Sequence, residues 1–159
     1  MENPLQTQVQ NQEFSVLLQK DDTPNGVENL VNAPAGESKG EDHKVENEIY
    51  KNVVYQLEIK KIYLDPKLSL AKFSSIVGTN TTYLSNTVNR RFGMNLKALV
   101  NRYRVGHAKR LMQELGSLTD IGELIRLCGF SSRSIFYSAF RREVGMTPTR
   151  YMAKVIVED

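Results

Sequence analysis

From about residue 46 onward, apolar residues recur at intervals of three and four positions, the spacing of one face of an α-helix. The first such stretch contains Ile49, Val53, Leu57 and Leu64. This helix should end before Asp65-Pro66, because proline disfavours helix in the preceding residue. No stretch shows the sustained alternation of a strand, so the pattern predicts an all-α fold.

Glycine, proline and capping residues divide the remaining chain into further helices. A short helix, Leu70 to Val77, follows the candidate N-cap Ser69 and stops at Gly78. The predicted helices after it are one from Asn80 or Thr81 to about Phe92, a long one from about Leu96 to Leu115, a short one from Thr119 or Asp120 to Cys128, one from Ser131 or Ser132 to Gly145, and a last one from Thr147-Pro148 through Val155. The total is about seven helices.

The same order of helices and helix-ending residues occurs twice, first over residues 68–95 and again over 118–148. Each copy has a short helix, a glycine break (Gly78 or Gly129), a longer helix that ends in two arginines, and a Gly-Met pair. A short helix, a glycine-containing turn and a longer helix make up the helix-turn-helix layout, whose second helix enters the DNA major groove. We therefore predict two helix-turn-helix subdomains, at about 68–94 and 119–145, joined by a linker helix at about 96–115.

Both second helices carry side chains suited to reading DNA. Hydroxyl and amide groups hydrogen-bond base edges, and arginine binds guanine. Such groups are Asn80, Thr81, Thr82, Ser85, Asn86 and Asn89 in the first copy, and Ser131, Ser132, Arg133, Ser134, Tyr137 and Ser138 in the second. Arg90-Arg91 and Arg141-Arg142 can neutralise phosphates. A single copy is equally well explained by helix caps and a solvated basic face, whereas two matching copies favour DNA binding.

Charge adds to this interpretation. Residues 1–45 hold three Lys and eight Asp or Glu, a formal charge of −5, whereas residues 46–159 hold eighteen Lys or Arg and ten Asp or Glu, a formal charge of +8. A basic domain favours a polyanionic partner, although a generally basic surface would look the same. Residues 1–45 are polar and rich in turn-forming residues, and they predict a disordered acidic tail or linker, or a short interaction segment.

Residues 68–151 resemble the AraC/XylS-type DNA-binding domain. The stretch CGFSSRSIFYSAFRREVGMTPTRY (128–151) is similar to the family signature, and LVNRYRVGHAKRLM (99–112) resembles the family's linker helix. The resemblance implies two recognition helices in successive major grooves, about one helical turn apart. By position it implies base contacts by Thr81, Thr82, Ser85, Asn86, Arg133, Ser134, Tyr137 and Ser138, and phosphate contacts by Arg90, Arg91, Arg141 and Arg142. Arg104 matches the family's linker-helix arginine, for which a phosphate contact and a packing role are both open.

The sequence departs from the family pattern at several positions. Ser74 and Ile125 stand where the family favours a small alanine, and Val88 replaces the usual phenylalanine. Ser85, Asn86 and Ser138 include positions where many members carry longer or basic groups. We therefore hypothesise that the first unit contributes more phosphate anchoring and less base specificity than the second.

Other candidate chemistry has plainer explanations. Phe130, Phe136, Phe140 and Tyr151 are expected in the core, His107 on the surface or packed, and Cys128 buried. With two His and one Cys, and no phosphate loop or nucleophile–histidine arrangement, we predict no catalytic site, metal site or cofactor. The rival to a DNA-binding regulator is a basic helical protein-interaction module or a nonspecific DNA binder.

The setting of the protein is predicted more coarsely. No apolar run approaches the ~18 residues of a membrane span, the N-terminus is no secretory signal, and a lone cysteine suits the reducing cytoplasm. RNA polymerase is a further candidate partner. Family members commonly carry a sensing domain, which residues 1–45 are too short and too polar to form. A small stand-alone regulator and the output end of a larger sensor both remain open.

Overall fold

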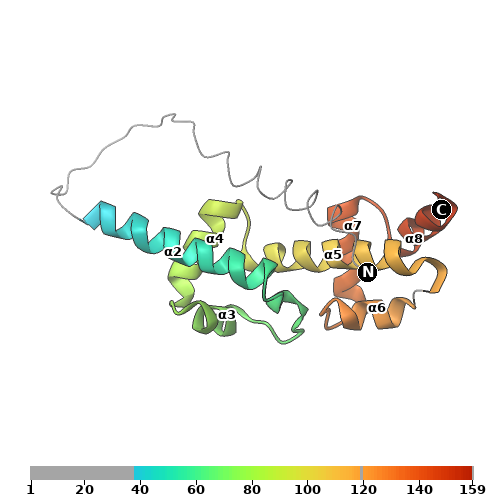
Figure 1. Cartoon of the computed structure of the whole chain (residues 1–159), viewed down its shortest axis with the longest axis horizontal. Coiled ribbons are helices and arrows are strands. Elements are labelled where there is room, and N and C mark those ends of the chain that lie inside the picture. Colours follow the sequence, from blue (N-terminus) through green and yellow to red (C-terminus); the bar gives the residue numbers. More distant parts are fainter. Residues whose placement is uncertain (1–37, 119, 159) are drawn as a thin grey trace, which may run out of the picture. The chain divides into compact units, whose positions relative to one another are not determined.

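The computed structural model of the protein describes residues 38–118 and 120–158, and every regular element in this part is helical (Figure 1). The α-helices are α2 (Ser38–Glu58), α3 (Leu70–Val77), α4 (Thr81–Phe92), α5 (Leu96–Leu115), α6 (Ile121–Leu127), α7 (Arg133–Val144) and α8 (Pro148–Glu158). Two short 3-10 helices are η1 (Ile62–Leu64) and η2 (Gly116–Leu118). The all-α prediction is confirmed.

Side-chain caps begin five of these helices, and four of the five caps are among those that the sequence predicts, Asn95 being the exception. In each case a side-chain oxygen accepts a hydrogen bond from the backbone N–H three residues later, which satisfies a donor that the helix itself leaves unpaired. The capping residues are Ser69, Asn80, Asn95, Asp120 and Ser132, with distances of 2.8–3.3 Å. The sequence left two alternatives for each of three caps. The structure has Asn80 rather than Thr81 and Ser132 rather than Ser131. It has Asp120 as the third cap, and Thr119 lies outside the described residues.

The first helix differs from the prediction at both ends. It begins at Ser38, inside the segment predicted as a polar tail, and the rest of that segment lies outside the described residues. The prediction that this helix continues to Leu64 is wrong, because α2 ends at Glu58 and Lys61 adopts the left-handed conformation with φ of 52°. The break carries Tyr63 into the interior, where its ring packs 5.6 Å from that of Tyr103.

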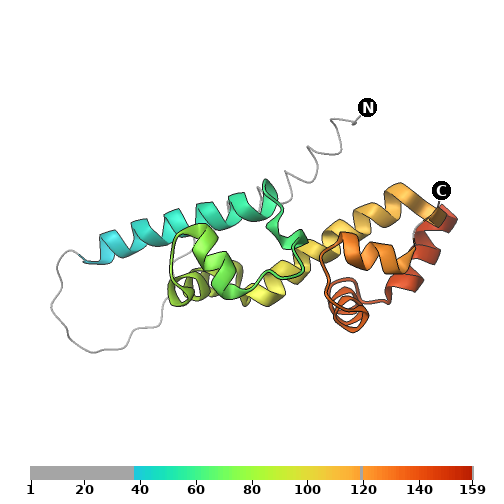
Figure 2. The same ribbon diagram turned by 90° about the horizontal axis from the view of Figure 1, so that it is seen from below.

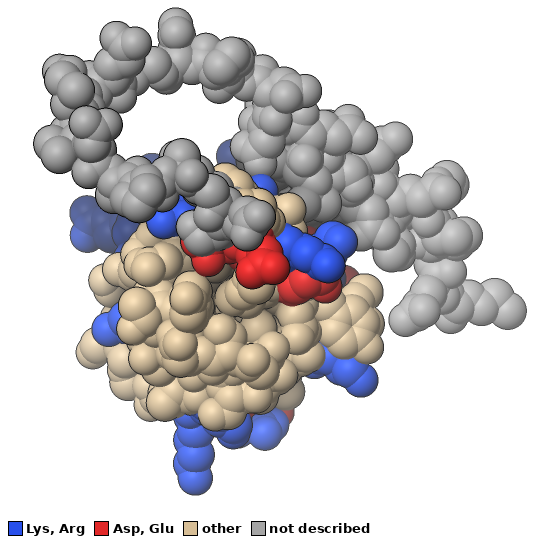
Figure 3. All heavy atoms as spheres, turned by 90° about the vertical axis from the view of Figure 1, so that its left-hand side faces the viewer, with Lys and Arg blue, Asp and Glu red and all other residues tan. Residues whose placement is uncertain are grey.

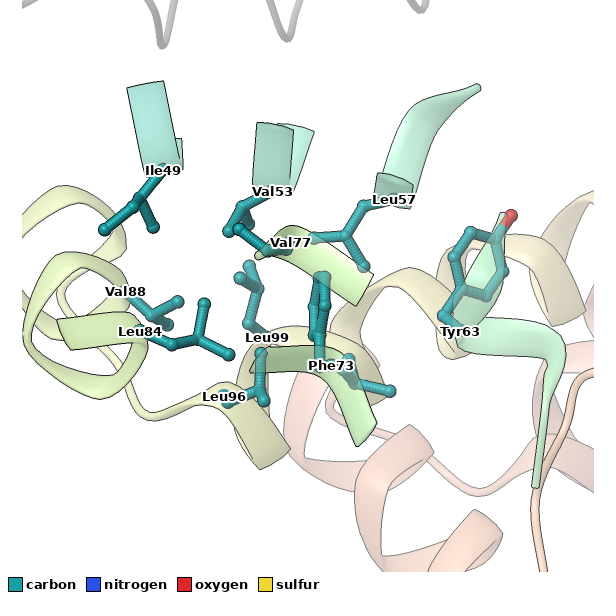
Figure 4. Packing of buried hydrophobic residues seen from close by; sticks show 11 residues of the cluster. Ile49, Val53, Leu57, Tyr63, Phe73, Val77, Leu84, Val88, Leu96 and Leu99 are labelled. Carbon is teal, nitrogen blue, oxygen red and sulfur yellow. The ribbon is translucent and has the colours of Figure 1, made fainter. Parts of the chain in front are cut away.

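Two clusters of buried side chains form the core, and α5 contributes to both. The first cluster joins α2, α3, α4 and the first half of α5 around Phe73 and Leu84. In Figure 4, Ile49, Val53 and Leu57 of α2 point into this cluster. The second joins the remainder of α5 to α6 and α7 around Phe136 and Phe140, and α8 packs against it.

Figure 2 shows α5 running from the first group of helices to the second. Leu96, Leu99 and Val100 at its start belong to the first cluster, whereas Val105 and Met112 belong to the second. The helix therefore acts as the predicted linker between two subdomains. Among the described residues, no helix is long and apolar enough to cross a membrane.

Candidate nucleic-acid interface

The two predicted helix-turn-helix units have the same turn geometry. Gly78 is the C-cap of α3, and Gly129 follows Cys128, the C-cap of α6; both glycines are left-handed, with φ of 78° and 76°. The residue after the glycine then donates to a carbonyl five positions back, at 2.9 Å for Thr79 to Ser74 and 3.1 Å for Phe130 to Ile125. This bonding satisfies carbonyls at the helix end and sets the direction in which α4 and α7 leave the turn.

The residues predicted to contact bases lie on the outer faces of α4 and α7. In α4 the core side is formed by Leu84, Thr87 and Val88, and in α7 by Phe136, Ala139 and Phe140. The predicted base-contact residues face away from these positions. Thr81, Thr82, Asn86, Arg133, Ser134 and Ser138 are exposed, and Ser85 and Tyr137 are half-buried. Access to a partner is therefore available, and the base contacts themselves stay a prediction.

Arg133 and Tyr137 form a small polar group on α7. The Arg133 guanidinium lies over the Tyr137 ring at 5.0 Å from its centroid, and its Nη2 donates to the Tyr137 hydroxyl at 3.0 Å. The same hydroxyl lies 3.1 Å from Oγ1 of Thr149 on α8. Thr149 was missed in the sequence analysis, because its distance along the chain from Tyr137 gave no signal of contact.

The paired arginines of the first unit are held by α2. Arg90 Nη1 lies 2.9 Å from one carboxylate oxygen of Glu46, and Arg91 Nε lies 3.2 Å from the other. Arg91 also donates to the side-chain oxygen of Asn47 and stacks over the Tyr50 ring. Figure 3 shows acidic and basic side chains standing next to one another on this end of the molecule. The Glu46 carboxylate therefore competes with a DNA phosphate for both arginines, for which phosphate contacts are predicted.

The paired arginines of the second unit are more open. Both Arg141 and Arg142 are exposed. Arg142 Nε lies 3.2 Å from Glu143, whose other oxygen accepts from Arg102 Nε at 3.1 Å. Within residues 38–118 and 120–158, no acidic side chain is within ion-pair distance of Arg141. It is the arginine of the two pairs that is best placed to receive a phosphate.

Arg104 is packed inside the fold, and its predicted phosphate contact stays a prediction. The residue is 8% exposed. Nε donates to the carbonyl of Tyr63 at 2.6 Å, Nη2 donates to that of Asp65 at 2.8 Å, and the guanidinium lies over the Phe130 ring. Burial lowers the pKa of Arg104, and the charge of Asp65 opposes that shift. The residue thus ties α5 to the chain leaving η1.

His107 and Cys128 are packed residues. His107 is half-buried against Tyr63, and its Nδ1 lies 3.2 Å from Arg110. Burial, followed by the charges of Arg110 and Lys61, lowers the pKa of His107 to about 4. Cys128 has no exposed surface, and burial raises the pKa of its thiol to about 12. Such a thiol is a poor nucleophile, because reactivity requires the thiolate.

Three of the positions that depart from the family pattern lie inside the fold, namely Ser74, Val88 and Ile125. Ser74 is buried, and its hydroxyl donates to the carbonyl of Ala71 at 2.9 Å. Val88 is wholly buried in the first cluster, and Ile125 packs against the second. Phe130, Phe136 and Phe140 are buried in the second cluster, and Tyr151 packs against it.

A family model described as a helix-turn-helix domain matches residues 73–154, more than half of the chain. The protein belongs to the AraC-type helix-turn-helix family. This domain is 36% identical over 89 residues to the probable transcriptional regulator LumQ of Photobacterium leiognathi, covering 56% of the chain and 35% of that protein. It is 32% identical over 95 residues to the HTH-type transcriptional regulator ExsA of Pseudomonas aeruginosa, covering 60% and 33%. The chain thus spans about a third of the length of these relatives.

Solved structures show the same AraC-type fold. A Listeria innocua protein of unknown function matches with a TM-score of 0.60 and 24% identity, covering 67% of this chain and 96% of the other. A transcriptional regulator from Chromobacterium violaceum, described as containing an AraC-type DNA-binding domain, matches with a TM-score of 0.55 and 20% identity, covering 71% and 96%.

Proposed function

We propose that this AraC-type domain binds double-stranded DNA sequence-specifically and regulates transcription, with α4 and α7 in successive major grooves. The observation that carries the proposal is the duplicated unit. Two helices follow glycine turns of matching geometry, and each presents an exposed polar face and ends in arginines. The names of the relatives as transcriptional regulators support it. The domain is then a binding module rather than an enzyme, acting in the cytoplasm beside bacterial DNA.

The base contacts would come from the eight exposed or half-buried residues of α4 and α7 named above. Arg141 and Arg142 would bind phosphates directly. Arg90 and Arg91 would do so only by exchanging Glu46 for phosphate oxygens. RNA polymerase and a separate sensing domain are further proposed partners, since relatives that share this domain are about three times longer than the matched region.

Selection from a random double-stranded DNA library with the full chain tests the proposal. Two enriched blocks about 10 base pairs apart are expected, with affinity falling steeply as salt rises. Arg141→Ala should weaken binding to all sequences and lower the salt slope by about one. Lys51→Ala on α2 is the matched control, since it removes one exposed positive charge from a helix other than the two recognition helices. Binding without enrichment would identify a nonspecific DNA binder, and no binding would favour the protein-interaction module.

A further inference from the structure

A cavity of about 440 Å³ lies between the first helix-turn-helix unit, the start of α5 and the start of α7. Its size falls within the range of small-molecule sites, roughly 300–1,000 Å³. Apolar side chains line much of it, namely Leu68, Leu70, Leu96, Val100 and Ile135. Ser85 of α4 and Ser131, just before α7, also line it, so an occupant would touch both DNA-reading units.

Asn101 is the unusual residue of this cavity. The residue is 6% exposed, yet within residues 38–118 and 120–158 its side-chain amide has no hydrogen bond to another residue. Every side-chain N or O atom wholly cut off from solvent does have a partner in that part of the chain. The amide of Asn101 must therefore be accessible from the cavity that the residue lines. No bond inside the described chain has to be broken for this amide to bond to a ligand in the cavity, so it is available to one.

The charge of the cavity wall indicates the sign of that ligand. Lys97 and Arg104 line the cavity, and no Asp or Glu does. Arg104 already donates to two neutral carbonyls, and Asp65, whose negative charge acts on it, does not line the cavity. The first residues of α3 and α5, with Ser69 and Asn95 as their N-caps, also line the cavity, and the dipole at a helix N-terminus favours a negative group.

We propose that this cavity binds a small organic anion, a carboxylate on an apolar body. The body packs against the apolar wall. The carboxylate accepts hydrogen bonds from Asn101 and Lys97. A DNA phosphate would satisfy the same polar groups but would leave the apolar wall uncovered, so a free carboxylate fits the lining better. Because the occupant contacts Ser85, it changes DNA affinity, a step that rests on the proposed function.

Binding of naphthoate to the full chain, without DNA, tests the site. With ¹⁵N-labelled asparagine, naphthoate should shift the side-chain amide signal of Asn101. Titration calorimetry should show that the unaltered protein binds neutral naphthamide about tenfold more weakly than naphthoate. The Lys97→Gln and Asn101→Leu variants should each bind naphthoate about tenfold more weakly than the unaltered protein does. Tenfold is the loss expected for one charge-assisted hydrogen bond. Lys51→Gln should bind as the unaltered protein does. Circular dichroism checks that both variants fold. Because Lys97 is exposed, its variant measures the contribution of this wall to naphthoate affinity even if the Asn101 variant does not fold.

The outcomes separate the sources of the negative group. Equal affinity for naphthoate and naphthamide, or full affinity in both variants, would overturn the proposal. If naphthoate does not bind and both variants bind all DNA sequences more weakly, the cavity holds a DNA phosphate, and the proposal is overturned. Naphthoate binding in a protein that binds no DNA would keep the site and reject the proposed function. Naphthoate that binds and lowers affinity for selected DNA supports both.

Discussion

At Gly129 the backbone is left-handed, and a Cβ built there would lie 2.5 Å from the carbonyl oxygen of Leu64. Gly78, at the matching position of the other unit, has the same backbone conformation but nothing within 4 Å of a Cβ. Gly78→Ala should cost about 1 kcal/mol of unfolding free energy through backbone strain alone. Gly129→Ala should cost about 2 kcal/mol more, because backbone atoms must move. Urea unfolding of both variants measures the difference, and equal losses would contradict the close approach.

Substitution of Arg104 separates its contribution to stability from a contribution to DNA binding. Its guanidinium satisfies the carbonyls of Tyr63 and Asp65, so Arg104→Ala should lower the free energy of unfolding by about 3 kcal/mol. The salt slope of DNA binding should not change, in contrast to Arg141→Ala. Urea unfolding and a salt titration of DNA affinity are the measurements. A stable variant with a reduced salt slope would support the phosphate contact.

The half-buried imidazole of His107 makes stability depend on pH. Its pKa is about 4 in the folded protein, below the ordinary value of 6.5, so the unfolded chain binds the proton more tightly. The contribution of His107 is fully present above pH 6.5 and should be lost as pH falls from 6.5 to about 4. Thermal unfolding of His107→Gln should show a weaker dependence in this window. His43→Gln, at an exposed position, is the control and should keep the dependence.

At the scale of elements, α2 both packs on the first unit and restrains its arginines. Glu46 is 14% exposed in side-chain surface and accepts from Arg90 and Arg91 at once. Glu46→Gln should raise DNA affinity about two- to fivefold at low salt, the strength of a surface ion pair. Glu48→Gln is the matched control, since Glu48 pairs with Lys51 on the same helix. A mobility-shift titration checks this, and an equal rise in both variants would show a general charge effect.

At the scale of the whole molecule, the two units are joined by one helix but differ in their surfaces. The first unit presents short hydroxyl and amide groups, whereas the second presents Arg133 braced by Tyr137. We expect Thr82→Ala and Asn86→Ala to weaken selected and scrambled DNA alike, and Arg133→Ala to weaken the selected site more. Competition binding with the two DNAs measures the ratio. A selective loss in the Thr82 or Asn86 variants would contradict the division of roles.

Much of this architecture follows from local signals in the sequence. Ser69 and Gly78 mark the ends of α3 because a serine hydroxyl can bond the first helical N–H groups and a glycine adopts the left-handed conformation without strain. Such preferences act within a few residues, so they are visible in one sequence. The repeat of the same punctuation was enough to predict two helix-turn-helix units and their exposed polar faces.

Contacts between distant residues were decided only by the tertiary structure. No glycine or proline marks the end of α2 at Glu58, and the chain that follows buries Tyr63 against α5. Three features join residues that are far apart in the chain. They are the buried hydrogen bonds of Arg104, the ion pairs of Glu46 with two arginines, and the cavity that Asn101 lines. A sequence indicates what a side chain is able to do. Packing decides which partners reach it, because burial removes water and leaves each polar group to the neighbours that the fold supplies.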